Sequence, residues 1–420
     1  MDNNKISLWP ELELENLKAI KVLGKGAMGT VFLVYDKSND PTARCPFALK
    51  VVEKSSVAIK PDADRRARWE ISVLNRLKQQ QSSHPFLPYL IGTCDTSDYL
   101  CWATPYCPGG DLNVLRFRQF DHVFSQSVIS FYLAEIICAL EKLHSMGIVY
   151  RDLKPENILI QQSGHLTLTD FDLARTLPPK KMETLLLTSD PEMEPSTGPR
   201  KQYNRHRRSL TRFIIHKMEK KKEFGSHKGL KKAKSARVSP VSRRNLNLPN
   251  ERSNSFVGTE EYVAPEVIRG DGHEFAVDWW ALGILCYEMM YGTTPFRGKN
   301  RKETFRKILM MQPEFIGKPN SLTDLIRKLL EKDPTRRLGY QRGALEIKEH
   351  QFFKGLRWDS LTEILRPPFL PSRDETELTE ELTNGGIEIK DYFQKLKVPA
   401  SPLWSPSLDE CRHNVSLTEF

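Results

Sequence analysis

The stretch 148–172 (IVYRDLKPENILIQQSGHLTLTDFD) constrains the fold more than any other part of the chain. Two short apolar runs within it, ILI and LTL, flank a Ser-Gly-His turn and predict a β-hairpin. The hairpin would hold Asp152 and Asn157 in the loop before it and Asp170 in the loop after it, on one rim. Such polar groups can grip a nucleotide phosphate and its metal ion. A packed core does not need them.

The same stretch reads Y-R-D-L-K-P-E-N and then D-F-D, which resembles the protein-kinase signature H-R-D-L-x-x-x-N followed by D-F-G. Tyr150 in place of His is similar to the AGC class of kinases. Asp172 replaces the last glycine of the motif. The backbone thereby loses the conformational freedom of glycine, and a second carboxylate is added near the metal. The D-F-D spelling is typical of a plant branch of AGC kinases, and the alternative interpretation is a weakened metal site.

This resemblance implies an α+β fold with two lobes, a small β-rich N-lobe and a large helical C-lobe. It also predicts where the segments of the chain begin and end. In chain order these are an N-terminal tail at 1–16, the N-lobe at 17–104, a hinge at 105–108, the C-lobe at 109–353 and a C-terminal tail at 354–420, with 17–353 forming the kinase domain.

A glycine-rich segment, G-K-G-A-M-G-T-V, follows the first predicted strand. It matches the G-x-G-x-x-G-x-V loop that covers ATP phosphates in kinases. A second strand comes next, whereas a dinucleotide-binding Rossmann unit would have a helix there. By resemblance, ATP is held by this segment and by the hinge, with Thr104 at the back of the adenine pocket. The expected nucleotide-binding residues are Leu23, Gly24, Lys25, Gly26, Ala27, Met28, Gly29, Thr30, Val31, Lys50, Pro105 and Cys107.

Lys50 lies inside the apolar run F-A-L-K-V-V, where a lysine is costly to bury unless it meets an anion. In the kinase signature this lysine pairs with the α- and β-phosphates of ATP. Its partner should be a glutamate on the next helix, which helical spacing predicts at 64–77. Glu70 lies on or beside the apolar face of that helix, whereas Glu53 is too close to the strand.

The resemblance also assigns the chemistry. Asn157 and Asp170 would hold Mg²⁺, Asp152 would accept or orient the proton of the substrate hydroxyl, and Lys154 would steady the γ-phosphate. Lysine at 154 is typical of serine/threonine kinases. A set of acidic residues falls where AGC kinases read basic residues before the phosphosite, which predicts a basophilic enzyme. These residues are Asp111, Glu156 and Glu288.

The chain carries a net charge of +10, and the charge is unevenly spread. Residues 176–252 hold 20 Lys and Arg against 7 Asp and Glu, a net charge of +13, so the rest of the chain carries −3. This composition predicts a largely disordered insert in the activation segment. Its function is open between nuclear import, contact with an anionic membrane, docking of a partner, and no fixed role. We expect a protein of the cytoplasm, the nucleus, or both, or one held at the plasma membrane.

After the insert, SNSFVGTEEYVAPE ends in the A-P-E that closes a kinase activation segment. Resemblance to AGC kinases makes Ser255 the activation-loop phosphosite and Thr259 a contact of Asp152. Further along, Asp278 would tie down the catalytic-loop backbone, and Arg337 would pair with the Glu266 of A-P-E.

The residues from 354 onward resemble the AGC C-terminal extension, which wraps the small lobe and ends in a hydrophobic F-x-x-F motif. Here Leu417 stands in place of the first Phe and Phe420 is the second. The tail and Ser255 together predict an upstream phosphoinositide-dependent kinase as a partner.

No apolar run approaches the ~20 residues of a membrane span, and the first ten residues lack signal-peptide features. Seven cysteines without a C-x-x-C pair argue against a disulfide framework or a zinc site. The motifs are most similar to the plant oxidative signal-inducible kinase group, of the AGC VIII type. We therefore expect a serine/threonine protein kinase using ATP and Mg²⁺, with no obligate nucleic acid. The alternatives are a kinase-fold scaffold of weak activity and a nucleic-acid-binding protein, each acting through the insert.

Overall fold

The computed structural model describes residues 11–26, 28–38, 45–57, 61–79, 84–177, 260–272, 274–363, 367–371 and 386–397. These residues all belong to one compact unit formed by Met1–Lys181 and Asn250–Phe420. Apart from its first two residues, the predicted insert 176–252 lies outside the described residues, and so do Ser255, Thr259 and the end of the tail at 417–420.

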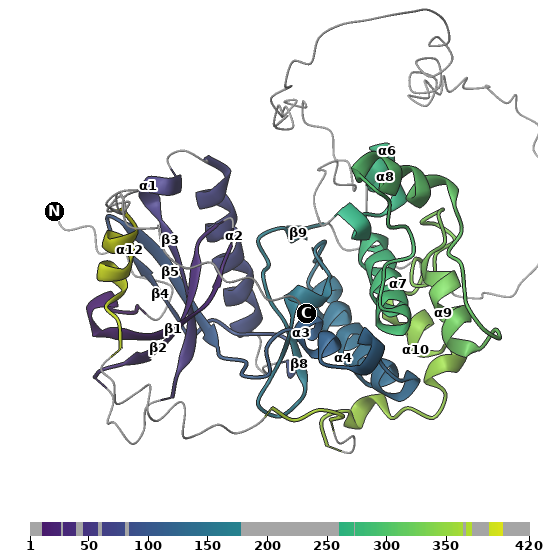
Figure 1. Cartoon of the computed structure of the whole chain (residues 1–420), viewed down its shortest axis with the longest axis horizontal. Coiled ribbons are helices and arrows are strands. Elements are labelled where there is room, and N and C mark those ends of the chain that lie inside the picture. The colour runs from purple at the N-terminus through teal and green to yellow at the C-terminus, as the bar shows by residue number, and fades with distance from the viewer. Residues whose placement is uncertain are drawn as a thin grey trace, which may run out of the picture. The chain divides into compact units, whose positions relative to one another are not determined.

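A five-stranded antiparallel sheet forms the N-lobe, in the order β1-β2-β3-β5-β4 (Figure 1). Its strands are β1 (Leu17–Lys25), β2 (Thr30–Asp36), β3 (Phe47–Glu53), β4 (Gly92–Asp95) and β5 (Tyr99–Pro105). The turn between β1 and β2 lies close against β3. A Cβ atom on Gly29 would lie 2.2 Å from the carbonyl oxygen of Val51, so only glycine fits there.

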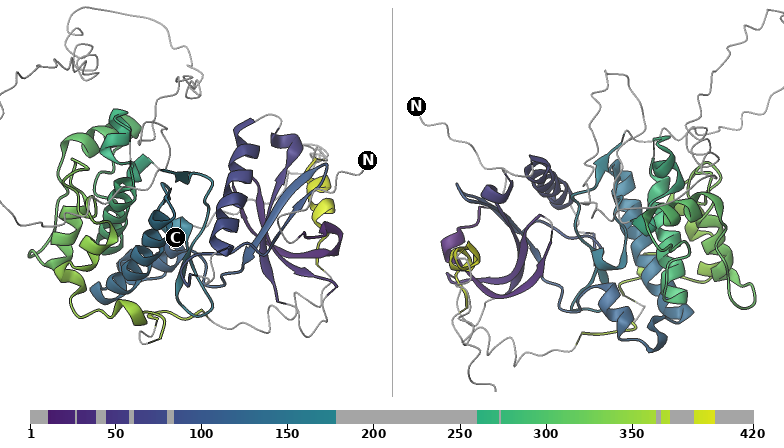
Figure 2. Two further views of the ribbon diagram at one scale, coloured as in Figure 1. Left: turned by 180° about the vertical axis from the view of Figure 1, so that it is seen from behind. Right: turned by 45° about the horizontal axis from the view of Figure 1, so that its top comes forward.

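The two faces of this sheet are covered by different parts of the chain, because successive side chains of a strand point to opposite faces. Val52 and Trp102 belong to the large core that contains helix α2 (Pro61–Lys78). Val51 and Cys101, their neighbours in sequence, belong to a second core that contains helix α12 (Ile389–Lys397) of the C-terminal tail. Figures 1 and 2 show α2 and α12 on opposite sides of the sheet.

Helix α12 is docked by aromatic packing and by backbone pairing. The ring of Phe393 contacts Phe32 and Tyr99 at centroid distances of 5.9 and 5.3 Å. Just before the helix, Ile387 exchanges backbone hydrogen bonds with Ala19 of β1. Residues 386–397 of the tail therefore lie on the small lobe, as the AGC resemblance implies, and they are held there by α12.

Helices make up most of the C-lobe, with α4 and α7 at its centre (Figure 2). The helices are α3 (Leu112–Phe117), α4 (Gln126–Ser145), α6 (Pro265–Arg269), α7 (Ala276–Tyr291), α8 (Arg301–Met310), α9 (Ser321–Leu329) and α10 (Ala344–Lys348). In α7, a Cβ on Gly283 would lie 2.8 Å from the Leu330 side chain, so α7 closely approaches the end of α9. No helix in the described part of the chain is long and apolar enough to span a lipid bilayer.

Two small sheets carry the loops of the stretch 148–172. One pairs β6 (Ile148–Val149) with β9 (Arg175–Thr176), and the other is the hairpin of β7 (Ile158–Ile160) and β8 (Leu166–Leu168). The hairpin turns at Gly164, whose φ of 84° is in the left-handed region. The predicted hairpin and the predicted two-lobed α+β fold are both confirmed.

Candidate active site

A cavity of about 1000 Å³ lies between the two lobes. The glycine-rich segment and β3 line it from the N-lobe, the hinge lines its back, and the loops around the β7–β8 hairpin line it from the C-lobe. The lining includes Leu23, Gly24, Lys25, Gly26, Met28, Gly29, Val31, Lys50, Thr104, Pro105, Cys107, Asp152, Lys154, Asn157 and Asp170.

Two of the predicted nucleotide-binding residues are not placed on this cavity. Thr30 is buried in β2, where it pairs with Lys25 and Val51, so the structure does not bring it to the nucleotide space. Ala27 lies outside the described residues.

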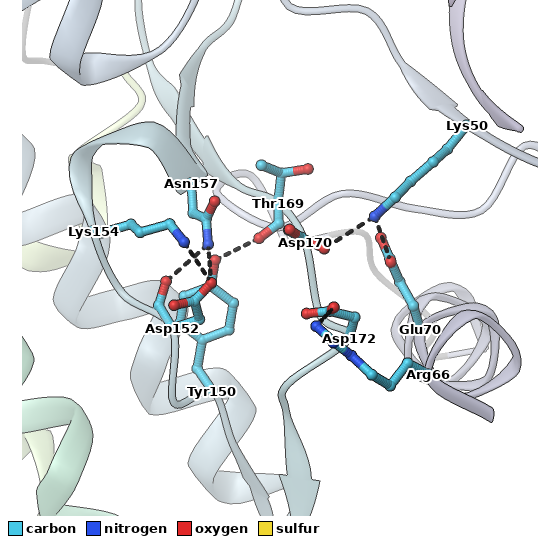
Figure 3. A network of polar contacts seen from close by, with 10 residues as sticks. All are labelled: Lys50, Arg66, Glu70, Tyr150, Asp152, Lys154, Asn157, Thr169, Asp170 and Asp172. Carbon is cyan, nitrogen blue, oxygen red and sulfur yellow. Dashed lines mark hydrogen bonds and ion pairs between the residues drawn. The ribbon is translucent and has the colours of Figure 1, made fainter. Parts of the chain in front are cut away.

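Lys50 connects the sheet, helix α2 and the loop after β8 (Figure 3). Its Nζ donates to Glu70 Oε2 at 2.8 Å and to Asp170 Oδ1 at 3.0 Å. Burial opposes the charge of this ammonium, but the two carboxylates outweigh burial and raise the pKa of Lys50 above its ordinary value. Lys50 is therefore a cation held between helix α2 and the loop after β8.

Asp152, Lys154 and Asn157 form a second polar group on the opposite side of that loop (Figure 3). Lys154 Nζ donates to Asp152 Oδ2 at 2.8 Å, and Asn157 Nδ2 donates to the same oxygen at 2.8 Å. Asp152 is 5% exposed, and burial raises the pKa of its carboxyl although Lys154 and Asn157 oppose this. A carboxylate of raised pKa is a better proton acceptor than an exposed aspartate.

The backbone of the catalytic loop is held by Asp278 of α7. Its two carboxylate oxygens accept from the N–H of Tyr150 at 2.9 Å and of Arg151 at 2.7 Å, and His144 Nε2 lies 2.8 Å away. Arg151 has a φ of 72°, in the left-handed region that disfavours a residue with a Cβ. The carboxylate, predicted for this place, thus holds a strained backbone next to Asp152.

Asp170 is also held in the left-handed region, with a φ of 58°. The fully buried ring of Phe171 beside it packs on Tyr150 at a centroid distance of 5.3 Å. The hydroxyl of Tyr150 donates to the carbonyl of Thr169. Aromatic packing and this hydrogen bond therefore fix Asp170 from both sides.

Asp172 forms an ion pair with Arg66 of α2 (Figure 3). The D-F-D motif predicts this carboxylate near the metal but does not indicate its partner. The two residues are 106 positions apart, and no local pattern connects them. Burial and the neighbouring charge of Asp170 raise the pKa of Asp172, whereas Arg66 lowers it.

The predicted structural pair of the A-P-E motif is also present. The two terminal guanidinium nitrogens of Arg337, Nη1 and Nη2, donate to the carboxylate of Glu266 at 2.6 and 2.9 Å, and the side chains are 0% and 4% exposed.

The three acidic residues predicted to read basic substrates are in different environments. Asp111 caps helix α3 by accepting from the Val114 N–H at 2.8 Å, and it lines the cavity together with Glu156. Glu288 forms an ion pair with Arg116 at 3.1 Å and accepts from the hydroxyl of Tyr262. The charge of Glu288 is thus already matched inside the protein, by a partner that the sequence does not predict.

The donor set of the site fits Mg²⁺ bound together with a nucleotide. Because Asn157 donates through its amide nitrogen, its oxygen is the atom that can ligate a metal, as is the carboxylate of Asp170. No cluster of three or more His, Cys, Asp or Glu side chains suited to a metal ion occurs in the described part of the chain. Mg²⁺ commonly uses one or two protein oxygens and completes its shell with phosphate oxygens and water.

Comparison with known proteins gives a consistent result. The protein kinase domain family matches residues 17–193 and 224–353. The chain is 56% identical over 420 residues to the serine/threonine-protein kinase UCN of Arabidopsis thaliana, covering 100% of this chain and 98% of that protein. It is 57% identical over 415 residues to UCNL of the same plant, covering 97% and 96%, and 42% identical over 388 residues to OXI1, covering 92% and 86%. The predicted resemblance to plant serine/threonine kinases is confirmed.

Proposed function

The chain belongs to the protein kinase family, and we propose that its cleft transfers the γ-phosphate of ATP to serine and threonine hydroxyls of proteins. One observation carries this proposal. Lys50, Asp152, Asn157 and Asp170 come from three separate parts of the chain and line one cavity. Serine/threonine specificity is supported by the names of the relatives and by Lys154 next to Asp152.

Each side chain has a distinct task in this transfer. Lys50, held by Glu70, orients the α- and β-phosphates of ATP. Asn157 and Asp170 would hold Mg²⁺, which when bound neutralises negative charge on the phosphate oxygens.

Asp152 accepts the proton of the substrate hydroxyl while the hydroxyl oxygen of the substrate forms a bond to the γ-phosphorus of ATP. The bond from the γ-phosphorus to the bridging oxygen breaks, and ADP leaves with that electron pair. Lys154 Nζ lies 2.8 Å from Asp152 Oδ2, and it would steady the transferred phosphate. Catalysis then rests mainly on positioning and charge stabilisation.

We further propose that substrates carry basic residues before the phosphorylated hydroxyl. Asp111 and Glu156 line the cavity and supply carboxylates for such residues. Glu288 would contribute only by sharing its charge with Arg116. The double variant Asp111→Asn, Glu156→Gln should weaken the preference for Arg or Lys in an arrayed-peptide assay, and asparagine at 111 can still cap α3. A wild-type protein without that preference would contradict the proposal.

Regulation and location are proposals from the sequence. We propose that phosphorylation of Ser255 activates the protein, and that an upstream phosphoinositide-dependent kinase uses the tail that ends in Leu417 and Phe420. The basic insert 176–252 would direct the protein to the nucleus, or to an anionic membrane surface at the cell periphery. Imaging of the full chain with and without 176–252 distinguishes these locations from an even distribution in the cytoplasm.

The central test is phosphorylation by the purified full-length protein with Mg-ATP. Wild type should phosphorylate itself and basic serine peptides, and both Asp152→Asn and Lys50→Met should lose this activity while remaining folded. A wild-type protein that is inert even after phosphorylation of Ser255 would show that the proposed catalysis does not occur.

A further inference from the structure

The contact between Asp172 and Arg66 joins helix α2 directly to the segment after Asp170. Arg66 Nη2 meets Asp172 Oδ2, and the Asp172 side chain is 4% exposed whereas that of Arg66 is 37% exposed. A carboxylate so deeply buried needs a partner, because an unpaired buried charge is costly. Arg66 supplies that partner.

Arg66 is placed so that this contact also bears on Glu70. Residues four apart on a helix lie on the same face, so Arg66 and Glu70 point together toward the cleft (Figure 3). Glu70 meets Lys50, and Lys50 meets Asp170. Helix α2 is therefore tied to the 170–172 segment twice, once through Lys50 and once directly.

Aspartate at 172 does not strain the backbone. Among residues 167–177, all of which the structure describes, the only non-glycine residue with a left-handed φ is Asp170. The glycine of the usual D-F-G motif brings flexibility to this position. In this chain the position is occupied by aspartate, which has less backbone freedom than glycine and has Arg66 as its ion-pair partner.

Arg66 also affects the balance of charges around Lys50. Three carboxylates, those of Glu70, Asp170 and Asp172, gather here, and the nearby cations are Lys50 and Arg66. Without Arg66 the Asp172 carboxylate would remain buried beside Asp170 and would compete for Lys50. Glu70 would then be displaced from Lys50.

We propose that Asp172 and Arg66 are positioning residues, which fix α2 against the metal-binding segment so that Glu70 keeps Lys50 aimed at the nucleotide. We call this pair the α2 latch. The inference rests on the proposed phosphotransfer function for its kinetic consequence, whereas the Arg66–Asp172 contact itself is seen in the structure.

The kinetic test compares Arg66→Met, Asp172→Gly and the double variant in the full-length protein. Arg66→Met should lower kcat/KM by about tenfold or more, because it leaves a buried carboxylate without a partner. The double variant should recover to within about threefold of Asp172→Gly, because the unpaired carboxylate is gone. Arg65→Met is the matched control. Arg65 is 68% exposed, pairs with Asp62 on the same helix, and should tolerate the change.

Two measurements separate positioning from other roles. In nucleotide-free protein, amide hydrogen exchange in α2 should become faster in Arg66→Met and remain unchanged in Arg65→Met. The Mg²⁺ concentration for half-maximal activity should not depend on Asp172→Gly. An increased Mg²⁺ requirement in Asp172→Gly but not in Arg66→Met would make Asp172 a metal ligand and overturn the latch.

The remaining outcomes are equally decisive. If the effects of Arg66→Met and Asp172→Gly multiply in the double variant, the two residues act independently and the proposal fails even though wild type is active. If wild type is inert but α2 exchange responds as expected, the latch stands and the phosphotransfer function fails.

Discussion

Replacing Asp278 by asparagine tests how firmly the catalytic loop is held. Asp278 is fully buried, and its two carboxylate oxygens accept from the N–H groups of Tyr150 and Arg151. Asparagine has nearly the same shape but only one accepting oxygen. Its NH₂ group would face one of the two backbone donors, which would be left without a partner.

The expected cost follows from these contacts. A buried donor left unsatisfied costs about 1–3 kcal/mol, and replacing a charged acceptor by a neutral one weakens the remaining hydrogen bonds by about 1 kcal/mol. The left-handed backbone of Arg151 is strained by about 1–3 kcal/mol in the wild type as well, so the strain adds nothing to this cost, but it favours a shift of the loop once one of the two hydrogen bonds is lost. We expect a loss of about 2–4 kcal/mol in the free energy of unfolding. Because Asp152 follows directly, kcat should fall by about 10²-fold.

Urea denaturation followed by tryptophan fluorescence measures the free energy of unfolding, and peptide phosphorylation at saturating ATP measures kcat. Asp324→Asn is the matched control. Asp324 also meets a histidine, with His350 Nε2 at 3.0 Å, but its side chain is 42% exposed. The control should lose no more than about 1 kcal/mol. An Asp278→Asn protein as stable as this control, with kcat within about twofold of wild type, would refute the reasoning.

Three further predictions concern stability. Arg337→Met should lower the free energy of unfolding by about 3–5 kcal/mol, because it leaves Glu266 charged and buried. Arg342→Met, which breaks an exposed ion pair, should lower it by at most about 1 kcal/mol. Equal urea midpoints for the two variants would contradict this. Phe393→Ala should lower the free energy of unfolding by about 3–5 kcal/mol, because this ring is 4% exposed. A melting temperature equal to that of wild type would mean that α12 is not docked. Burial, together with nearby lysines, lowers the pKa of His84 to about 4, so the unfolded chain binds a proton that the folded protein does not. Stability should therefore fall as the pH drops from about 6.5 toward 4, and His84→Gln should flatten that slope; an unchanged slope would rule His84 out as its source.

Features that depend on local pattern were predicted closely. The hairpin at 158–160 and 166–168 was predicted to the residue, because two short apolar runs and a glycine turn specify it locally. Helix α2 was predicted at 64–77 and extends over Pro61–Lys78. Its early start agrees with proline as a first helical residue, where no N–H partner is needed. Glu70 was chosen from helical spacing, and it meets Lys50.

Contacts that depend on tertiary structure could not be read in this way. Nothing in the spacing of Arg66 or Asp172 indicates that they meet, since the contact depends on where α2 packs. The same holds for Phe393 against Phe32, which are 361 positions apart and are joined only because the tail returns to the small lobe. Glu288 was interpreted from resemblance alone, and its partner Arg116 on α3 became visible only in the folded protein.

The half-buried Cys107 lines the nucleotide cavity at the hinge, and this has a consequence for chemical reactivity. Burial raises the pKa of its thiol to about 12. At pH 7.4 only about one molecule in 10⁴–10⁵ would carry the thiolate, the form that reacts with peroxides and most electrophiles. Peroxides and electrophiles should therefore react with Cys107 more slowly than with an exposed cysteine, although this residue lines the cavity.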